Sequence, residues 1–253
     1  VEPAAEVEPA AEVEPAAEVE NEIDAFDSEL LNCNFEIDKD GDNVPDNLDV
    51  EGPIDWSYCD LSGVDLSHRD LSGANLENTQ LKYAHLNGTD LSGANLHASS
   101  MRYAYLYDTN FSGADLSYSQ IYKAIIGGDT TFDYANLSYA NLCAATLDFY
   151  SFKGTDFSHA DFDHASVWGA DFREAIVAYT NFYDSELIGA DLSNKDLTGT
   201  ILTEANLTDA VLTGSDLSNM DLTGTMLIDT DLTGADLTNA VLTGAILTGA
   251  DLS

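Results

Sequence analysis

The twelve residues from Asp38 to Asp49 are the part of this chain best suited to binding chemistry. They read DKDGDNVPDNLD, with carboxylates at positions 1, 3, 5, 9 and 12. Calcium takes about six to eight oxygen ligands, and alternate residues of a tightly turned loop point their oxygens inward. Five carboxylates with one lysine among them would repel one another without a cation. The segment therefore predicts a Ca²⁺ site with the ligands Asp38, Asp40, Asp42, Asp46 and Asp49.

The loop resembles the calcium-binding acidic loops of thrombospondin type 3 repeats in its aspartate triplet, its Pro45-Asp46 pair and its closing Asp49. It departs from the EF-hand pattern, because Gly41 stands at position 4 rather than 6 and Asp replaces the closing Glu. A solvated acidic turn is the alternative, since Asp, Asn, Gly and Pro also form turns. Weak calcium sites are typical of extracellular modules. We therefore expect an extracellular or cell-surface protein, with a cytoplasmic location as the alternative.

The loop lies in an acidic junction, residues 21–55, between two segments of different composition. Residues 1–20 repeat VEPAAE three times, and such a Pro-, Ala- and Glu-rich segment cannot bury a core. We expect a disordered acidic stalk there. Cys33 and Cys59 flank the start of the next segment. They either pair in an exported protein or remain free, buried thiols.

Residues 56–253 repeat every five residues. A large apolar residue recurs from Leu61 to Ile126 and, after a one-residue slip, from Phe132 to Leu252, which makes thirty-nine repeats. A small residue stands two positions before each, and Asp or Asn commonly stands between them. A period of five matches neither a helix nor a strand, and short fixed repeats stack into solenoids. Each pentad is expected to form one side of a coil, with the large and small residues inside.

The pattern is similar to that of the pentapeptide-repeat family, through motifs such as Ala74-Asn75-Leu76, Ala94-Asn95-Leu96 and Ala114-Asp115-Leu116. The resemblance implies an all-β fold, a right-handed four-sided parallel β-helix of about ten coils. Trp56 stands in the large-residue register and is expected to cover the first coil. The slip at residues 127–131 predicts a bulge. Four bulky or polar residues at the small position should point differently or distort a corner: Arg69, Tyr150, Lys195 and Met220.

The net charge of −38, from 46 acidic and 8 basic residues, argues against nucleic acid or an anionic membrane as a partner. No apolar run is long enough to span a membrane. Three explanations of the acidity stay open: Asp built into the repeat, a role in binding basic proteins or mimicking DNA, and a high-salt habitat. The histidines have no zinc-site spacing, and no phosphate-binding loop or nucleophile motif occurs. We therefore expect no enzyme.

Residues twenty apart should stack on one side of a four-sided coil. This places Lys82 above Arg102 and Tyr83 above Tyr103, and allowing for the slip it aligns a longer aromatic ladder. Exposed aromatic residues often contact proteins or glycans. The alternative is that the rings stack only because their strands are adjacent. The candidate contact residues are Tyr83, Tyr103, Tyr118, Tyr139, His159, Trp168 and Tyr179.

These features together predict a non-enzymatic rod that spaces or presents a binding face for a protein or glycan. The family resemblance supplies an alternative, because some pentapeptide-repeat proteins are cytoplasmic, resemble DNA in shape and charge, and bind type II topoisomerases. A weaker alternative is ice binding through Thr198, Ser218 and Thr238. The uncapped last repeat, Ala250 to Ser253, predicts a longer rod or end-to-end self-association through its open strand edges.

Overall fold

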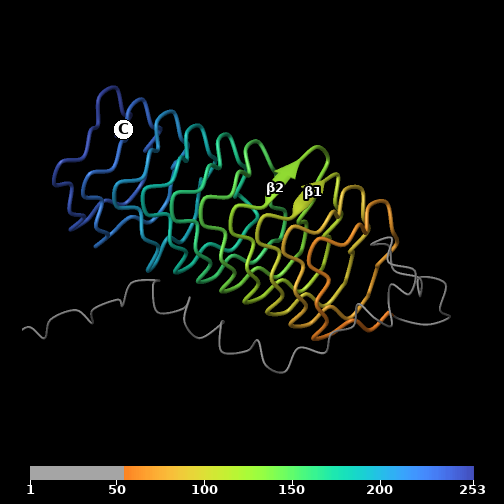
Figure 1. Cartoon of the computed structure of the whole chain (residues 1–253). Coiled ribbons are helices and arrows are strands. Elements are labelled where there is room, and N and C mark those ends of the chain that lie inside the picture. The colour runs from red at the N-terminus through yellow and green to blue at the C-terminus, as the bar shows by residue number, and fades with distance from the viewer. Residues whose placement is uncertain (1–53) are drawn as a thin grey trace, which may run out of the picture.

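The computed structural model describes residues 54–253. The predicted stalk, Cys33 and the whole predicted calcium loop lie outside the described residues. The described chain winds into a rod of stacked, roughly rectangular coils (Figure 1). Parallel bridges join residues twenty apart, such as Asp55 to Asn75 and Asn75 to Asn95. With one large apolar residue in every five, a twenty-residue coil has four sides, as predicted.

Each side is one pentad whose large residue points into the rod. Leu61 and Leu66 are fully buried, and so are the small residues two positions before most large ones. A tight turn follows each large residue, because the Val64 N–H donates to the Leu61 carbonyl at 3.2 Å. The third residue of this turn, Gly63, has a φ of 72°. A positive φ at this position is the type II pattern. The five-residue period therefore combines a short extended segment with one turn.

Asp residues before the large positions cap these turns. The backbone N–H groups of Ser67 and Ser72 donate to Oδ1 of Asp65 and Asp70 at 2.9 and 3.1 Å. Hydrogen bonds from the two serines hold the pKa values of both aspartates below their ordinary value. The aspartate carboxylates thus stabilise the turns of the repeat itself, which favours the explanation that Asp is built into the repeat.

Polar residues at the small, inward position are hydrogen-bonded within the rod. The hydroxyl of Thr79 donates to the Trp56 carbonyl at 2.7 Å, and that of Thr89 to the Leu66 carbonyl at 2.8 Å. Trp56 itself is 3% exposed, which agrees with its predicted place in the large-residue register.

The four bulky residues at the small position behave in two ways. Arg69, Tyr150 and Lys195 are only half-buried, as expected of side chains that turn outward. The Lys195 ammonium donates to the Ala175 carbonyl at 2.6 Å. Met220 differs from them, because it stays buried at 8% exposure. Its flexible, apolar side chain fits the interior where charged ones do not.

The slip is confirmed as a one-residue bulge. Strand β1 (Tyr105–Tyr107) pairs in parallel with β2 (Ile125–Gly127), and Tyr107 aligns with Gly127. The next bridge, Asn110 to Thr131, spans twenty-one residues, so the extra residue lies between Gly127 and Thr131. The bridges from Asp115 and Gln120 also span twenty-one residues, and the twenty-residue register returns with the bridge from Asn136 to Asp156.

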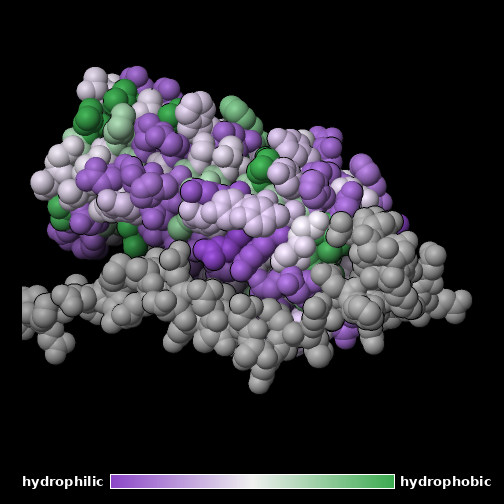
Figure 2. Space-filling view, viewed as in Figure 1, coloured by the Kyte–Doolittle hydropathy of each residue, from purple (hydrophilic) through white to green (hydrophobic). Residues whose placement is uncertain are grey.

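At the last coil the large positions are no longer covered. Leu242 and Leu252 are 37% and 59% exposed, and Figure 2 shows hydrophobic atoms gathered at this end beside a mostly hydrophilic surface. No helix in residues 54–253 has the length and apolarity needed to cross a membrane.

Candidate contact surfaces

Four aromatic rings form one ladder along a corner of the rod, which we call the corner ladder: Tyr118, Tyr139, His159 and Tyr179. Successive ring centroids lie 4.7, 4.5 and 4.8 Å apart, and the planes are within 6° of parallel. The predicted order is confirmed, including the one-residue shift between the first two members. The three tyrosines are 46–52% exposed. The ladder is therefore a regular, half-exposed aromatic surface.

The corner ladder occupies a backbone position that favours glycine. Its four residues have φ values of 59° to 61°, in the left-handed region. An L-residue with a side chain is destabilised there by about 1–2 kcal/mol. Fifteen glycines and twenty-three other residues in the described part of the chain have a positive φ, so glycine avoids the strain at this turn position but is not required there. Strained residues of this kind are retained where they have a use or where neighbours stabilise them.

Gly199 marks one end of the corner ladder. It follows Tyr179 by twenty residues and has a φ of +69°. A Cβ atom on Gly199 would lie 2.2 Å from Cδ1 of Tyr179, so the ring lies flat over the glycine backbone. Any side chain at residue 199 would push the last ring away from the rod.

The structure divides the seven predicted contact residues among three parts of the surface. We number the sides of the rod so that face 1 contains residues 114–118, face 2 contains 119–123 and face 3 contains 124–128, each with its stacked equivalents. The corner ladder lies where face 1 meets face 2. Tyr83 and Tyr103 lie where face 2 meets face 3, and their rings stack at 5.2 Å with planes 9° apart. Trp168 lies on face 3 and is 44% exposed.

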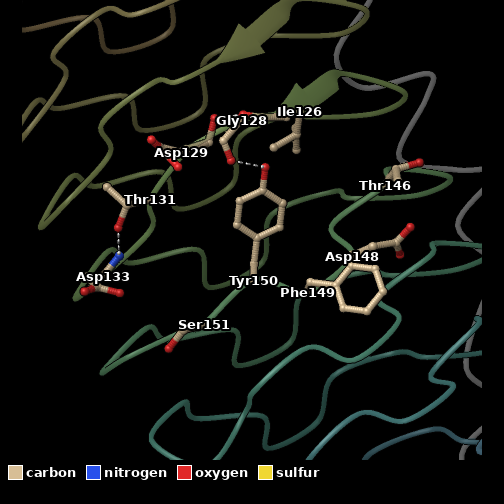
Figure 3. Close-up of a pocket in the computed structure, with 12 residues that line it drawn as sticks. Ile126, Gly128, Asp129, Thr131, Asp133, Thr146, Asp148, Phe149, Tyr150 and Ser151 are labelled. Carbon is tan, nitrogen blue, oxygen red and sulfur yellow. Dashed lines mark hydrogen bonds between the residues drawn. The ribbon is translucent and has the colours of Figure 1, made fainter.

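A groove of about 610 Å³ opens beside the bulge (Figure 3). Tyr150 stands at a small position, and its hydroxyl reaches across the groove to donate to the Gly128 carbonyl at 3.4 Å. Burial raises the pKa of Tyr150. Next to it, the Phe149 ring is 77% exposed at a φ of 65°. Sequence reasoning missed the groove. Its two signals were the slip and the oversized Tyr150.

The described part of the chain contains no candidate metal site, and the predicted calcium ligands lie outside it. Residues 54–253 contain no group of three or more His, Cys, Asp or Glu side chains placed to hold a metal ion. Cys59 is disulfide-bonded, whereas Cys143 is a free thiol that donates to Oδ2 of Asp161 at 3.2 Å. Burial, together with Asp161, raises the pKa of the Cys143 thiol. A thiol of this kind is a poor nucleophile.

Comparison with known proteins identifies the repeat. A family model described as pentapeptide repeats matches in eight copies, over residues 59–97, 89–128, 144–177, 180–219, 190–227 and 218–253. No curated protein matches this chain significantly in sequence.

Several solved structures resemble the chain. HetL, a pentapeptide repeat protein involved in heterocyst differentiation regulation in the cyanobacterium Nostoc, is 25% identical over 78% of this chain and 89% of its own, with a TM-score of 0.32. QnrB1, a plasmid-mediated fluoroquinolone resistance protein, is 24% identical over 72% of this chain and 80% of its own, with a TM-score of 0.31. A thylakoid-lumen pentapeptide repeat protein of Arabidopsis thaliana is 23% identical over 50% of this chain and 70% of its own, with a TM-score of 0.22.

The family fold is a right-handed quadrilateral β-helix, and the inward large residues, the corner turns and the twenty-residue register of this rod agree with it. The chain belongs to the pentapeptide-repeat family.

Proposed function

We propose that this protein is a non-enzymatic rod that presents the corner ladder to a protein or glycan partner outside the cell or at its surface. Pentapeptide-repeat proteins are generally structural or interaction proteins. The observation that carries the proposal is the alignment of four half-exposed rings at turn positions where glycine would be unstrained.

The corner ladder has the properties of a preorganised contact. Each ring is held by its neighbours at the strand spacing, so binding would freeze few side-chain rotamers. Tyrosine offers a large apolar area and a polar hydroxyl at low entropic cost. The residues immediately before the rings are small, which leaves the rings prominent: Ser117, Ser138, Ser158 and Ala178.

The proposal includes calcium at the aspartates of residues 38–49 and an oxidising setting. The disulfide at Cys59 supports such a setting, because disulfides persist mainly in secreted and surface proteins. The loop composition supports calcium over transition metals, since hard cations prefer carboxylate oxygens.

The contact proposal is tested by replacing two rings together, Tyr139→Asn with Tyr179→Asn. Asn tolerates the left-handed turn, so the rod keeps its shape while losing the aromatic surface. Binding of the full chain to an array of neutral glycans and to immobilised extracellular matrix proteins should be lost in the double variant. Asn219→Ala, at the same corner beyond the ladder, is the control that should bind normally. Unchanged binding by the double variant would contradict the proposal.

A DNA-mimic role is the second candidate, and the charge of −38 is the observation that favours it. Outward carboxylates stack in register in places, as in the pairs Asp216–Asp236 and Asp231–Asp251. A type II topoisomerase supercoiling assay separates the two functions. Inhibition or quinolone protection by the rod at stoichiometric concentration would favour the mimic, and no effect would favour the scaffold.

End-to-end self-association through the last coil stays a prediction. The exposed Leu242 and Leu252, together with the uncovered strand edges, favour pairing with another chain. Light scattering should show a mass that rises with protein concentration, and a Leu242→Lys variant should remain monomeric. A wild-type mass that stays at one chain over the whole concentration range would contradict it.

A further inference from the structure

One surface of the rod lacks the acidic residues that dominate the rest of the chain. Residues 79–88, 99–107 and 119–128 contain no Asp or Glu, although 46 of the 253 residues are acidic. These three segments stack directly, since Gln80 bridges to Ser100 and Ser100 to Gln120. At this bridge position the repeat otherwise often has Asp, as at Asp60 and Asp161 on the same face. The three segments therefore form a continuous acid-free surface over face 2, its corner with face 3, and face 3 as far as Tyr107 in the middle coil.

Basic and aromatic side chains replace the missing carboxylates. Lys82, Arg102 and Lys123 are three of only eight basic residues in the chain. The Arg102 guanidinium lies 5.4 Å and the Lys123 ammonium 4.9 Å from the ring centroid of Tyr122. The Tyr122 ring in turn meets Tyr103 edge-on at 5.7 Å. The Tyr122 ring thus positions the Lys123 ammonium, and this interaction leaves the positive charge of the lysine in place.

One tyrosine ring at the edge of this surface has an open face. Tyr83 is 56% exposed and stacks on Tyr103 with one side of its ring. On the other side, one coil earlier, stands Gly63, and a Cβ atom built there would meet nothing within 4 Å. The described residues therefore leave open space beside Gly63, on the side of Tyr83 away from Tyr103.

We propose that this acid-free surface binds an acidic polysaccharide running along the rod. Its carboxylates would meet Lys82 and Lys123, and a sugar ring would pack against the open face of Tyr83. The amides of Gln80 and Gln120 offer donors and acceptors for hydroxyl groups. The surface repeats at the strand spacing of about 4.8 Å, which suits a linear polymer better than a compact ligand that needs a pocket.

The positive charge of this surface can attract a polyanion locally, although the protein as a whole is strongly acidic. At physiological ionic strength, exposed charges are screened beyond about 8 Å. The nearest carboxylates lie at the borders of the surface: Asp60 and Asp65 bridge to Gln80 and His85 one strand away, Glu77 and Asp115 lie on face 1, and Asp108 lies at the far corner of face 3. Double-stranded nucleic acid is disfavoured, because its dense phosphate charge meets the repulsion of the whole rod. The polysaccharide surface shares no residue with the corner ladder, so this inference stands without the proposed ladder contact.

The test is calorimetric titration of the full chain with polygalacturonate, without added calcium. Wild-type protein should bind, and binding should weaken as salt is raised. Lys82→Gln with Lys123→Gln should weaken binding about tenfold, as expected for two exposed charge contacts. The matched control is Lys153→Gln with Arg173→Gln, which removes the same net charge from another side of the rod and should leave binding unchanged.

A second variant keeps the test decisive if charge removal perturbs the rod. Tyr83→Asn removes the open ring, and Asn tolerates its φ of 60°. This variant should melt normally and bind polygalacturonate several-fold more weakly. The proposal is overturned if wild-type protein does not bind, if the two charge variants lose binding equally, or if poly-glutamate or a single-stranded oligonucleotide binds as tightly. Tyr139→Asn with Tyr179→Asn should bind polygalacturonate normally, which separates this surface from the corner ladder.

Discussion

Two substitutions of Tyr139 distinguish the backbone strain at the corner ladder from the stabilisation that ring stacking provides. Tyr139 has a φ of 59° and stacks on Tyr118 at 4.7 Å and on His159 at 4.5 Å. Tyr139→Ala and Tyr139→Asn both remove the two ring contacts. They differ in the backbone, because Asn visits the left-handed region far more readily than Ala.

The magnitudes follow from these two contributions. Two aromatic contacts stabilise by about 0.5–1.5 kcal/mol each, and the half-exposed position places them in the lower half of that range. Tyr139→Ala should therefore destabilise the rod by about 1–2 kcal/mol. Tyr139→Asn loses the same contacts but relieves about 1 kcal/mol of backbone strain, so its stability should fall by about 0–1 kcal/mol.

The assay is urea unfolding followed by circular dichroism, with the urea midpoints compared at the wild-type slope. Ala98→Gly is the control at the same corner, because Ala98 has a φ of 54° and carries no ring. It should stabilise the rod by about 1 kcal/mol if the strain is real. Equal stability of the Asn and Ala variants would refute the strain argument. A loss above about 3 kcal/mol for Tyr139→Asn would show that the rings hold the rod together, and the contact role would then lose its main support.

Three further predictions concern the calcium loop, the free thiol and the turn aspartates. Calorimetric titration with Ca²⁺ should release or absorb heat, and Asp40→Ala with Asp42→Ala should abolish the signal. The absence of any heat from the wild-type chain would contradict the predicted calcium site. Cys143 should react with a thiol reagent at pH 8 only after unfolding, because burial raises its pKa; rapid labelling of the folded rod would contradict this. The depressed pKa values of Asp65 and Asp70 mean that their turn hydrogen bonds stabilise the fold above the ordinary value of 3.8 and are lost as the pH falls through the lower folded values. The urea midpoint should therefore fall as the pH is lowered below about 4, and a midpoint that rises there would show that relief of charge repulsion outweighs these bonds.

The five-residue period predicts most of the fold because burial leaves a direct mark on the sequence. Every large position from Leu61 to Leu232 has to be apolar to fill a closed interior, and the structure buries them. The corner ladder is equally predictable, since four pentads per coil align Tyr118 with Tyr139 across the slip.

The rest could not be read from a five-residue pattern. The positive φ of the ring-bearing turns depends on backbone geometry, and tyrosine gives no hint of it. The groove arises because Tyr150 is too large for the interior and turns out beside the bulge. The acid-free surface spans segments twenty residues apart, each too short to stand out alone. These features can be predicted only when it is known which residues the coil places next to one another, in addition to the five-residue repeat.

The two aromatic surfaces meet at one coil, and their geometry argues that they serve different ligands. Residues 118–123 place Tyr118 at one edge of face 2 and Lys123 at the other. Beyond that coil, Asp161 and Asp163 return to face 2, so a polyanion would be repelled from the next part of the rod. The corner ladder continues past this boundary to Tyr179. A single acidic polymer therefore cannot use both surfaces along their whole length. Charge substitutions at Lys82 and Lys123 should then affect one ligand, and ring substitutions at Tyr139 and Tyr179 the other.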